Sequence, residues 1–455
     1  MVGNSKRSCL TIILAAGEGK RMASSLPKVL HEVAGLPMVC HVIDTASAAG
    51  TQDTALVVGT KAELVAARVR SHNPHCSIHV QHQRMGTAHA VLASRSAVSS
   101  DHDDVVVLYG DVPLVKTETI EAARQTLARG ADICVMGFNT DEPTGYGRLI
   151  VEEQKLLAIR EHKDATPQER SITFCNSGIM VFRAGCMLQV LDKIGNANSQ
   201  GEYYLTDAVE VGNSMGLNVA ALEVPEEETL GVNDRLQLAQ VEAIWQERRR
   251  AELLRSGVSM TAPHTVFFNH DTVLESDCLI EPNVVFGPKV AVASGAAIRA
   301  FSHLEGATVE HGAIVGPYAR LRPGAVIGNG AKIGNFVEVK AANVGQGAKV
   351  NHLSYVGDAE VGAKANIGAG SITCNYDGFN KSKTVIGSGA FIGTNTSLVA
   401  PVTIGVNANT AAGSVITKDV PEDALAIERC KQANLPGKAK TLRQTYSKRK
   451  QETQK

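Results

Sequence analysis

The second half of the chain carries an apolar residue at every sixth position, and this period constrains the fold more than any other feature. The series includes Leu274, Ile280, Phe286, Val292, Ile298 and Leu304 and, with occasional one-residue slips, continues to Ile416. An α-helix repeats its buried face about every 3.6 residues and a strand every two, so neither explains a period of six. A parallel β-helix does, because three short strands form each coil and each strand points one apolar residue inward. We expect a left-handed parallel β-helix of hexapeptide repeats. A loosely ordered glycine-rich tail would not keep one spacing through so many repeats.

The first half follows a different pattern, in which short β-branched runs alternate with helical stretches. The runs are Cys9–Leu14, Thr54–Val58, Val105–Leu108, Ile133–Gly137 and Ile179–Phe182. This alternation is typical of βαβ units around a largely parallel sheet. We therefore predict a Rossmann-like α/β domain ahead of the β-helix.

The length of the chain and these two patterns predict two domains and a linker. At 455 residues the chain is too long for one ordinary core. We expect an α/β domain over residues 1–231, a connecting helix over 232–257, a β-helix over 258–437 and a basic flexible tail over 438–455. The segment 373–384 breaks the six-residue register, so we expect it to leave the coil as a loop. Arg248, Arg249 and Arg250 in the connecting helix could bind phosphate, but a solvated helix face is the favoured interpretation.

Composition excludes several classes of function. The formal net charge is -1, so no overall basic field attracts nucleic acid or an anionic membrane. The nine cysteines form no C-x-x-C pair, which argues against a zinc ribbon, a redox motif or a disulfide framework. No apolar run approaches the roughly 20 residues that a membrane-spanning helix needs. We expect a soluble cytoplasmic protein that acts on small molecules, without nucleic acid or membrane insertion.

A glycine-rich turn follows the first expected strand and is the first candidate binding element. It runs from Leu14 to Met22, with Pro27 and Lys28 close behind. Its glycines let backbone N–H groups approach a phosphate, and Arg21 and Lys28 supply positive charge. The turn lacks the spacing of a Walker A loop and the third glycine of a dinucleotide fingerprint. Alone it could be purely structural.

A carboxylate after the strand Val105–Leu108 strengthens that candidate. Asp111 lies at the carboxyl end of an expected parallel strand, where ligands of open α/β sheets bind. We therefore interpret Asp111 as a magnesium ligand rather than a turn-former.

The order of motifs along the chain resembles that of the sugar-1-phosphate nucleotidyltransferases. The motifs are the turn from Leu14 to Met22, Pro27–Leu30, Gly86–His89, Tyr109–Asp111, Pro143–Arg148, Glu161–Asp164, Asn176–Gly178 and Gly231–Asn233. With the hexapeptide half, nearly the whole chain resembles the bacterial bifunctional N-acetylglucosamine-1-phosphate uridylyltransferase / glucosamine-1-phosphate acetyltransferase family. The resemblance implies acetylation of glucosamine 1-phosphate by acetyl-CoA. It also implies transfer of UMP from UTP to N-acetylglucosamine 1-phosphate, with release of pyrophosphate.

The resemblance also implies roles for residues of the first domain. The nucleotide and sugar would lie against Leu14, Ala15, Ala16, Gly17, Lys28, Gln81, Gly86, Thr87, Tyr109, Gly147, Glu161, Asn176 and Asn233. Asp111 and Asn233 would bind Mg²⁺. The sugar phosphate is already a nucleophile, so this site needs alignment and charge neutralisation rather than a strong base. Lys20 departs from the threonine common in the family, which puts one polar contact in doubt.

Polar residues interrupt the β-helix repeat, and the resemblance assigns them to acetyl transfer. Glucosamine 1-phosphate would bind Arg322, Lys340, Tyr355 and Asn366, and acetyl-CoA would contact Ala369, Asn375, Tyr376, Thr394, Ala412 and Arg429. His352 would be the general base, a task that suits an imidazole because it titrates near neutral pH. Thr394 replaces the serine frequent in the family and retains a hydroxyl. The resemblance further implies a homotrimer with acetyltransferase sites between subunits.

Three other interpretations compete with this one. A zinc-dependent β-helix enzyme would need a close histidine set, whereas His303, His311 and His352 are widely spaced. A glucose-1-phosphate nucleotidyltransferase with a regulatory β-helix would not need His352 and the loop residues Asn375 and Tyr376. A non-catalytic assembly protein would not need both Asp111 and Asn233.

Overall fold

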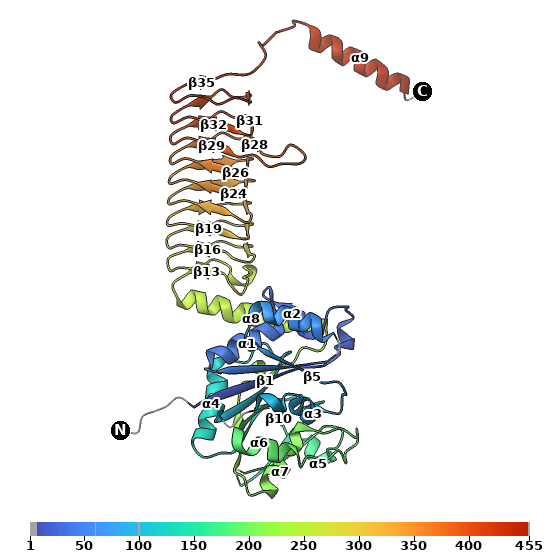
Figure 1. Ribbon diagram of the computed structural model, residues 1–455. Coiled ribbons are helices and arrows are strands. Elements are labelled where there is room, and N and C mark those ends of the chain that lie inside the picture. Colours follow the sequence, from blue (N-terminus) through green and yellow to red (C-terminus); the bar gives the residue numbers. More distant parts are fainter. Residues whose placement is uncertain (1–6, 60, 99–100, 154, 454–455) are drawn as a thin grey trace, which may run out of the picture. The chain divides into compact units, whose positions relative to one another are not determined.

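The chain forms two compact units in the computed structural model, which describes residues 7–59, 61–98, 101–153 and 155–453 (Figure 1). The first unit extends to Glu252 and includes Phe268–His270, and the second comprises Leu253–Phe267 and the chain from Asp271 onward. The helix α8 (Arg235–Arg255) runs from the first unit into the second.

The first unit is built on a nine-stranded sheet with the main order β11-β7-β10-β6-β1-β4-β5. The strands are β1 (Cys9–Ala15), β4 (Asp53–Val58), β5 (Ser77–Val80), β6 (Asp104–Tyr109), β7 (Ile133–Asn139), β8 (Arg148–Glu152), β9 (Lys155–Arg160), β10 (Phe174–Arg183) and β11 (Val219–Glu223). All five strands expected from the sequence are present. Neighbours pair in parallel except at β10 and the β8–β9 hairpin, which are antiparallel. A small hairpin, β2 (Glu32–Val33) with β3 (Leu36–Pro37), stands apart.

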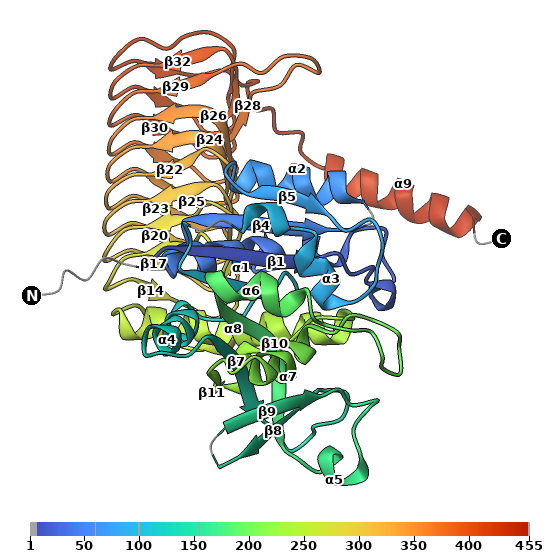
Figure 2. The ribbon, with the colours of Figure 1, turned by 60° about the horizontal axis from the view of Figure 1, so that its bottom comes forward.

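Helices cover both faces of this sheet, as Figure 2 shows. One face packs against α1 (Met38–Ala48), α2 (Ala62–His72) and α4 (Thr117–Ala128), and the other against α3 (Thr87–Leu92), α6 (Ala184–Leu191) and α7 (Ala208–Ser214). β1 alternates between the two cores, with Ile13 in one and Ile12 in the other. Both faces are therefore apolar, as in other sheets sandwiched between helices. A short helix, α5 (Pro167–Arg170), begins at a Thr166 capping box.

The carboxyl ends of β1 and β6 meet at one edge of the sheet. Leu14 is paired with Tyr109, and the Gly110 N–H donates to the Leu14 carbonyl at 2.9 Å. The Val232 N–H donates to the Asp111 carbonyl at 2.9 Å, which brings the segment before α8 to the same edge. Three distant parts of the sequence thus converge where open α/β sheets bind ligands.

The second unit is a stack of coils, each made of short parallel strands (Figure 1). One sheet has ten strands: β12 (Ser259–Met260), β14 (Leu279–Ile280), β17 (Ala297–Ile298), β20 (Ile314–Val315), β23 (Lys332–Asn335), β25 (Lys349–His352), β27 (Asn366–Ile367), β30 (Phe391–Ile392), β33 (Asn409–Thr410) and β35 (Leu425–Ala426). The other has fourteen: β13 (Val273–Leu274), β15 (Val285–Phe286), β16 (Ala291–Val292), β18 (His303–Leu304), β19 (Ala307–Val309), β21 (Arg320–Leu321), β22 (Ala325–Ile327), β24 (Glu338–Val344), β26 (Tyr355–Val361), β28 (Ile372–Cys374), β29 (Thr384–Ile386), β31 (Ser397–Val399), β32 (Val402–Ile404) and β34 (Val415–Ile416).

The six-residue series forms the interior of this parallel β-helix. Every apolar residue of the series named above, from Leu274 to Ile416, is buried. Each coil lies on the previous one in strict register, so that Ile298 is paired with Ile280 on one side and Val315 on the other. The interior is thus a column of stacked aliphatic side chains, and the period is confirmed as that of a β-helix.

Two segments of the second unit lie outside the regular coils. The segment between β28 and β29 leaves the coil as a projecting loop, as the break in register predicted (Figure 1). The tail was expected to be flexible, but it contains a helix, α9 (Lys438–Thr453), whose residues are all exposed. Among the described residues, no helix combines the length and apolar character needed to cross a membrane.

Candidate active sites

A cleft of about 380 Å³ lies at the carboxyl ends of β1 and β6, within the usual range of small-molecule sites. Ten residues proposed from the sequence line it: Leu14, Ala15, Ala16, Gly17, Lys28, Gln81, Gly86, Thr87, Tyr109 and Asp111. Arg84 and Glu202 line it as well, and sequence reasoning missed both. Arg84 pairs with Glu18 of the glycine-rich turn at 2.6 Å. Its position in the sequence, two residues before Gly86, could have indicated that it lies at the cleft.

The glycine-rich turn has to be compact because Lys28 packs against it. Gly19 has a φ of 63°, and a Cβ at this position would lie 2.6 Å from the Lys28 Cβ. Only glycine adopts this conformation at such a close approach without strain. Lys20 points outward and pairs with Glu18 at 2.8 Å, so its departure from the family pattern leaves the cleft itself unchanged.

Lys28 contacts both of the residues proposed to bind a metal. Its Nζ forms an ion pair with the Asp111 carboxylate and donates to the Asn233 Oδ1 at 3.2 Å. All three side chains are at least half-buried, and Asn233 is 205 residues from Lys28 in the sequence. The structure thus places a cation between one carboxylate oxygen and one amide oxygen; Lys28 and Asp111 line the cleft, whereas Asn233 does not.

Three residues proposed to bind the sugar, Gly147, Glu161 and Asn176, are not part of the cleft lining. The Asn176 N–H donates to the Gly147 carbonyl at 2.8 Å, and the Asn176 Oδ1 accepts from Gly178 at 3.0 Å. Burial raises the pKa of Glu161, whose Oε1 accepts from the Thr206 hydroxyl at 3.1 Å. Sequence reasoning did not identify Thr206, because it belongs to a distant segment with no motif of its own.

Tyr109 lies between the cleft and the residues proposed to bind the sugar. Burial, and after it the carboxylates of Glu161 and Asp111, raise the pKa of the Tyr109 phenol, so both carboxylates lie near its ring. A Cβ on Gly178 would lie 2.8 Å from that ring, which explains why this position is glycine. Tyr109 thus links the cleft, which it lines, to the segment of Asn176 and Gly178.

In the β-helix, four of the proposed residues stack at one corner of successive coils. The Gly370 N–H donates to the His352 carbonyl, the Asn395 N–H to the Ala369 carbonyl and the Gly413 N–H to the Thr394 carbonyl. His352, Ala369, Thr394 and Ala412 thus form one column along the coil axis. The Arg429 guanidinium donates to the Ala412 carbonyl at 2.8 Å and places a positive charge at the far end.

The imidazole of His352 is oriented by a residue that sequence reasoning missed. Its Nδ1 lies 2.9 Å from the Asn335 Oδ1, and the two residues pair in register on β25 and β23. The amide oxygen can only accept, so Nδ1 carries the hydrogen and the Nε2 of the neutral ring is free to take a proton.

A second column of polar groups lies on the neighbouring face. Arg322, paired with Glu338 at 2.9 Å, lies one coil below Lys340. The Tyr355 phenol reaches over Gly357, the residue paired with Lys340, and contacts the Asn375 amide at 3.4 Å. Asn366 lies on β27, on a different face from this column. Tyr376 is exposed on the projecting loop.

The projecting loop adds a further cation to this column. Lys381 lies near Lys340, and its interaction with Lys340 lowers the pKa of Lys381. Two adjacent ammonium groups attract an anion such as a phosphate. The break in register singled out the loop, but nothing in the sequence distinguished Lys381 from the other lysines.

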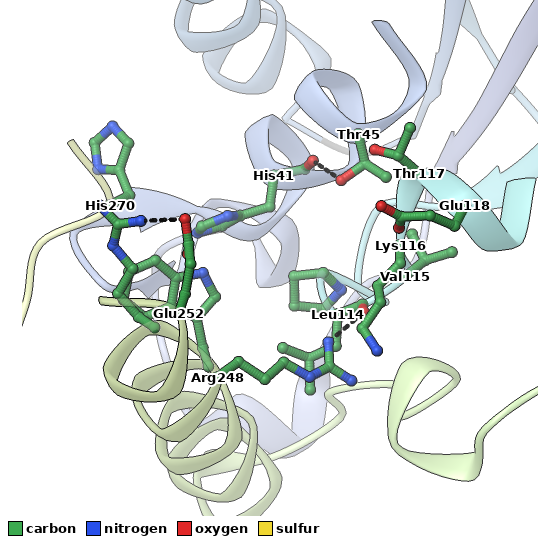
Figure 3. Close-up of a pocket in the computed structure, with 13 residues that line it drawn as sticks. His41, Thr45, Leu114, Val115, Lys116, Thr117, Glu118, Arg248, Glu252 and His270 are labelled. Atoms are coloured by element: carbon green, nitrogen blue, oxygen red, sulfur yellow. Dashed lines mark hydrogen bonds and ion pairs between the residues drawn. The ribbon is translucent and has the colours of Figure 1, made fainter. Parts of the chain in front are cut away.

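The structure corrects the interpretation of the arginine cluster Arg248–Arg250. Two of its residues, Arg248 and Arg249, line a second hollow of about 330 Å³ in the first unit (Figure 3). Arg250 is only 7% exposed, so Arg248–Arg250 is not a solvated helix face. Arg248 reaches the Leu114 carbonyl at 2.7 Å, as Figure 3 shows, and pairs with Glu227 at 2.9 Å. Arg249 pairs with Glu252 at 2.8 Å. Arg248 connects α8 to the sheet domain, whereas Arg249 and Arg250 pair with glutamates of α8 itself, so all three charges are paired.

Comparison with known proteins decides the family. Residues 11–173 match the MobA-like NTP transferase domain, and residues 306–341 match the bacterial transferase hexapeptide repeats. "Bifunctional protein GlmU" from Rhizobium etli is 57% identical over 96% of this chain and 97% of its own length. The proteins of that name from Agrobacterium fabrum and Brucella anthropi are 56% and 55% identical, over 96% and 97% of this chain and 97% of their own lengths. The chain belongs to the bifunctional GlmU family. It is therefore a bifunctional transferase, with the uridylyltransferase and acetyltransferase activities of UDP-N-acetylglucosamine synthesis.

A solved structure is also similar to part of the chain. It is described as a glucose-1-phosphate thymidylyltransferase from Bacillus anthracis in complex with sucrose. It covers 52% of this chain and 95% of its own, at 19% identity and a TM-score of 0.44, which is too weak to bear on function.

Proposed function

We propose that the cleft of the first unit binds UTP and N-acetylglucosamine 1-phosphate and that Asp111 and Asn233 hold Mg²⁺. The uridine nucleotide would lie against Leu14, Ala15, Ala16, Gly17, Gln81, Gly86 and Thr87, and the sugar against Tyr109, Gly147, Glu161 and Asn176. The observation that carries this proposal is the contact of Lys28, which lines the cleft, with both Asp111 and Asn233.

The donor set fits a magnesium ion. A carboxylate and an amide oxygen are hard oxygen ligands, and Mg²⁺ is usually held by one or two carboxylates together with substrate phosphates. The Lys28 ammonium, which contacts both groups, acts as a stand-in cation and shows that they can share one positive charge. The bound ion would supply charge neutralisation on the triphosphate.

The chain's own residues would align the reacting groups for uridylyl transfer. A phosphate oxygen of the sugar phosphate attacks the α-phosphorus of UTP, and the bond to pyrophosphate breaks. Glu161 and Asn176 would orient the sugar, while Lys28 would move from Asp111 towards the phosphates as negative charge enters the cleft. No general base is needed, because the attacking oxygen is already ionised.

We propose that the two polar columns of the β-helix form the acetyl-transfer site. Arg322, Lys340 and Tyr355 of the second column would bind glucosamine 1-phosphate, together with Asn366 from a different face, and the neighbouring cations suit its phosphate. Acetyl-CoA would run along the corner column of Ala369, Thr394 and Ala412 to Arg429, and it would also contact Asn375 of the second column and Tyr376 of the projecting loop.

His352 would act as the general base in this site. Its Nε2 takes a proton from the glucosamine nitrogen as that nitrogen attacks the thioester carbon. The carbon–sulfur bond then breaks, the His352 imidazolium gives its proton to the leaving sulfur, the acetyl group stays on nitrogen and CoA leaves as the thiol. Asn335 fixes the tautomer that this step requires. We propose that acetylation precedes uridylyl transfer.

We place both activities in the cytoplasm, with small-molecule substrates and without nucleic acid or membrane insertion. All nine cysteines are free thiols, and most are buried. Free thiols are typical of a reducing compartment.

A ladder of aromatic rings on the β-helix supports the proposed homotrimer. The rings of Phe301 and Tyr318 stack at 4.9 Å and those of Tyr318 and Phe336 at 5.2 Å, and each side chain is about half exposed. Leu353 continues the ladder and is next to His352. A partner subunit packed on this stripe would therefore lie beside the acetyl-transfer corner and cover its apolar surface.

Replacing Tyr318 and Phe336 together by asparagine should dissociate the trimer. Both residues have positive φ angles, of 55° and 57°, which asparagine accepts with less strain, so the coils should still fold. We expect a monomer in light scattering and at least a roughly tenfold loss of acetyl transfer, with uridylyl transfer unchanged. Lys289→Asn, at a φ of 56° on another corner, is the matched control. A double variant that remains a trimer would show that the ladder is not the interface.

A fragment that ends at Asp271 should keep uridylyl transfer, because the first unit includes Phe268–His270. Gln246 is 2% exposed, and its amide both donates to the Phe268 carbonyl at 2.7 Å and accepts from the Phe268 N–H at 2.9 Å. A fragment that ends at Glu252 loses both bonds and should be less stable by about 1–3 kcal/mol in urea unfolding. Equal stability of the two fragments, or an inactive but folded 271-residue fragment, would contradict this division.

Metal removal tests the two-site proposal on the intact protein. With EDTA, formation of UDP-N-acetylglucosamine from UTP and N-acetylglucosamine 1-phosphate should stop, and excess Mg²⁺ should restore it. CoA release from acetyl-CoA and glucosamine 1-phosphate should continue at its full rate. Loss of both reactions, or of neither, would contradict the assignment of the metal to the Asp111 site alone.

A further inference from the structure

The Gln81 side chain is almost completely buried at the wall of the uridylyl-transfer cleft. It is 6% exposed, lies directly after β5 and is anchored through its N–H to the Val58 carbonyl at 2.8 Å. It lines the cleft together with Leu14 and Gly86. A buried amide at such a position must find partners for its hydrogens and its oxygen, or a ligand must supply them.

Two neighbouring groups fix the orientation of this amide. The Gln81 Nε2 donates to the Gly86 carbonyl at 3.2 Å and to the Nδ1 of His89 at 3.1 Å. A backbone carbonyl can only accept, so the NH₂ group and not the oxygen must face Gly86. Both amide hydrogens are thus used inside the protein. The Oε1 has no hydrogen-bond partner among the described residues, so an acceptor is what Gln81 can still offer to a ligand.

The Gly86 carbonyl is held in place by the surrounding backbone. It also accepts from the Ala90 N–H at 3.1 Å, as the first bond of α3. Gly86 has a φ of 110°, and a Cβ there would collide with the backbone of Tyr203, whose N–H donates to the Met85 carbonyl at 2.7 Å. The position of this acceptor is therefore set by the fold and does not adapt to the nucleotide.

His89 is the second group that orients the Gln81 amide, and it is a side chain that can be replaced. It lies on α3, does not line the cleft and contacts Gln81 from the side of a small adjoining hollow. Because its Nδ1 accepts from Gln81, the hydrogen of the neutral ring is on Nε2. A turned amide would place its oxygen against two acceptors, the Gly86 carbonyl and the His89 Nδ1. Without His89, only the Gly86 carbonyl would oppose this turn.

We propose that His89 is a positioning residue that makes the uridylyl-transfer site selective for uracil over cytosine. The inference rests on the proposed function, in which Gln81 lies against the uridine nucleotide. Uracil presents an N3–H donor to the fixed Gln81 oxygen, whereas the N3 of cytosine carries a lone pair and would face an acceptor with an acceptor. A rigid site built for one hydrogen-bond pattern discriminates strongly, because the wrong base leaves buried polar groups unpaired.

Comparing UTP with CTP in position-89 variants tests the proposal on the full-length enzyme. The wild type should favour UTP strongly in kcat/KM with N-acetylglucosamine 1-phosphate. In His89→Ala only the Gly86 carbonyl opposes the turned amide, which offers its NH₂ group to cytosine N3, so this orientation becomes less costly. The UTP-to-CTP ratio should then fall roughly tenfold to a hundredfold, mainly through KM. His89→Asn, whose Oδ1 can accept from Gln81 in place of Nδ1, should recover most of the ratio.

Two controls separate positioning from a structural effect. A residue that only stabilises α3 would lower the turnover of both nucleotides together and leave their ratio unchanged, and that result would overturn the proposal. His82→Ala changes an exposed histidine that lines the same hollow without contacting the Gln81 amide, and should leave the ratio unaltered. A wild-type protein that does not use UTP would refute the proposed function itself. An unchanged ratio in His89→Ala alongside normal UTP use would refute only the role of His89.

Discussion

Replacing Asp111 by alanine is expected to abolish uridylyl transfer, by about a thousandfold or more, and to leave acetyl transfer nearly intact. Asp111 supplies the only carboxylate of the proposed magnesium pair and is also the ion-pair partner of Lys28. Without it the charge of the triphosphate is not neutralised in the transition state, a contribution of several kcal/mol. The thioester reaction involves no comparable charge. Both half-reactions, measured separately on the purified variant, check this expectation.

Asp111→Asn provides a matched variant of the same shape. It keeps an amide oxygen for the metal but loses the negative charge, so it should retain more uridylyl transfer than the alanine variant. Calorimetric titration with Mg²⁺ and UTP should show weakened binding in both. Equal loss of uridylyl and acetyl transfer in a folded Asp111→Ala protein would mean that the sites are coupled or wrongly assigned.

Replacing His352 by alanine is expected to slow acetyl transfer by about 10²- to 10⁴-fold, the usual contribution of a positioned general base. Acetyl-CoA affinity should change little, because the proposed cofactor column extends away from His352 to Arg429. Uridylyl transfer from supplied N-acetylglucosamine 1-phosphate should be unaffected. Single-turnover acetyl transfer, cofactor binding and the melting temperature should all be measured on this variant.

Two neighbouring residues, Asn335 and Leu353, help to distinguish a structural role of His352 from its proposed role as general base. If the imidazole only braces the coil corner, its removal would lower the melting temperature or dissociate the trimer, because Leu353 continues the aromatic ladder. Asn335→Ala should slow acetyl transfer less than His352→Ala, since it leaves the base but frees its tautomer. A stable His352→Ala protein with near-normal acetyl transfer would refute the general-base assignment.

The sequence predicted the β-helix well because its interior is specified by local spacing. One residue in six faces inward, so burial of Ile298 or Val350 follows from its position in the repeat without knowledge of any distant contact. Strand positions in the first unit were also predicted from local sequence, because each predicted strand is a short β-branched run. The antiparallel β10 was not distinguished from its parallel neighbours, since a strand buried on both faces reads alike in either direction.

Distant contacts of the sites could not be derived from spacing. Asn233 meets Lys28 across 205 residues only because the segment before α8 returns to the edge of the sheet. Thr206 belongs to no motif, and His89 ends the motif Gly86–His89, but the role of each depends on which side chain lies opposite it. Asn335 could have been found, because it lies one coil, or 17 residues, before His352.

The arginine cluster of α8 shows where inference from composition fails. A run of charges is usually solvated, but Arg250 is buried and Arg248 reaches across to the Leu114 carbonyl. The sequence shows the charges but not the acidic groups and carbonyls that neutralise them, such as Glu227. The helix α9 was missed because its polar sequence has no apolar face to reveal a helical period.

The most direct test of the whole account is a product analysis on the full-length protein. Glucosamine 1-phosphate, acetyl-CoA, UTP and Mg²⁺ are supplied together, and phosphorus NMR with mass spectrometry follows the products over time. We predict that N-acetylglucosamine 1-phosphate appears first, followed by UDP-N-acetylglucosamine with equal amounts of CoA and pyrophosphate. We also predict that omitting acetyl-CoA leaves UTP unconsumed. A nucleotide sugar without the acetyl group, or UDP-N-acetylglucosamine formed without release of CoA, would contradict the account.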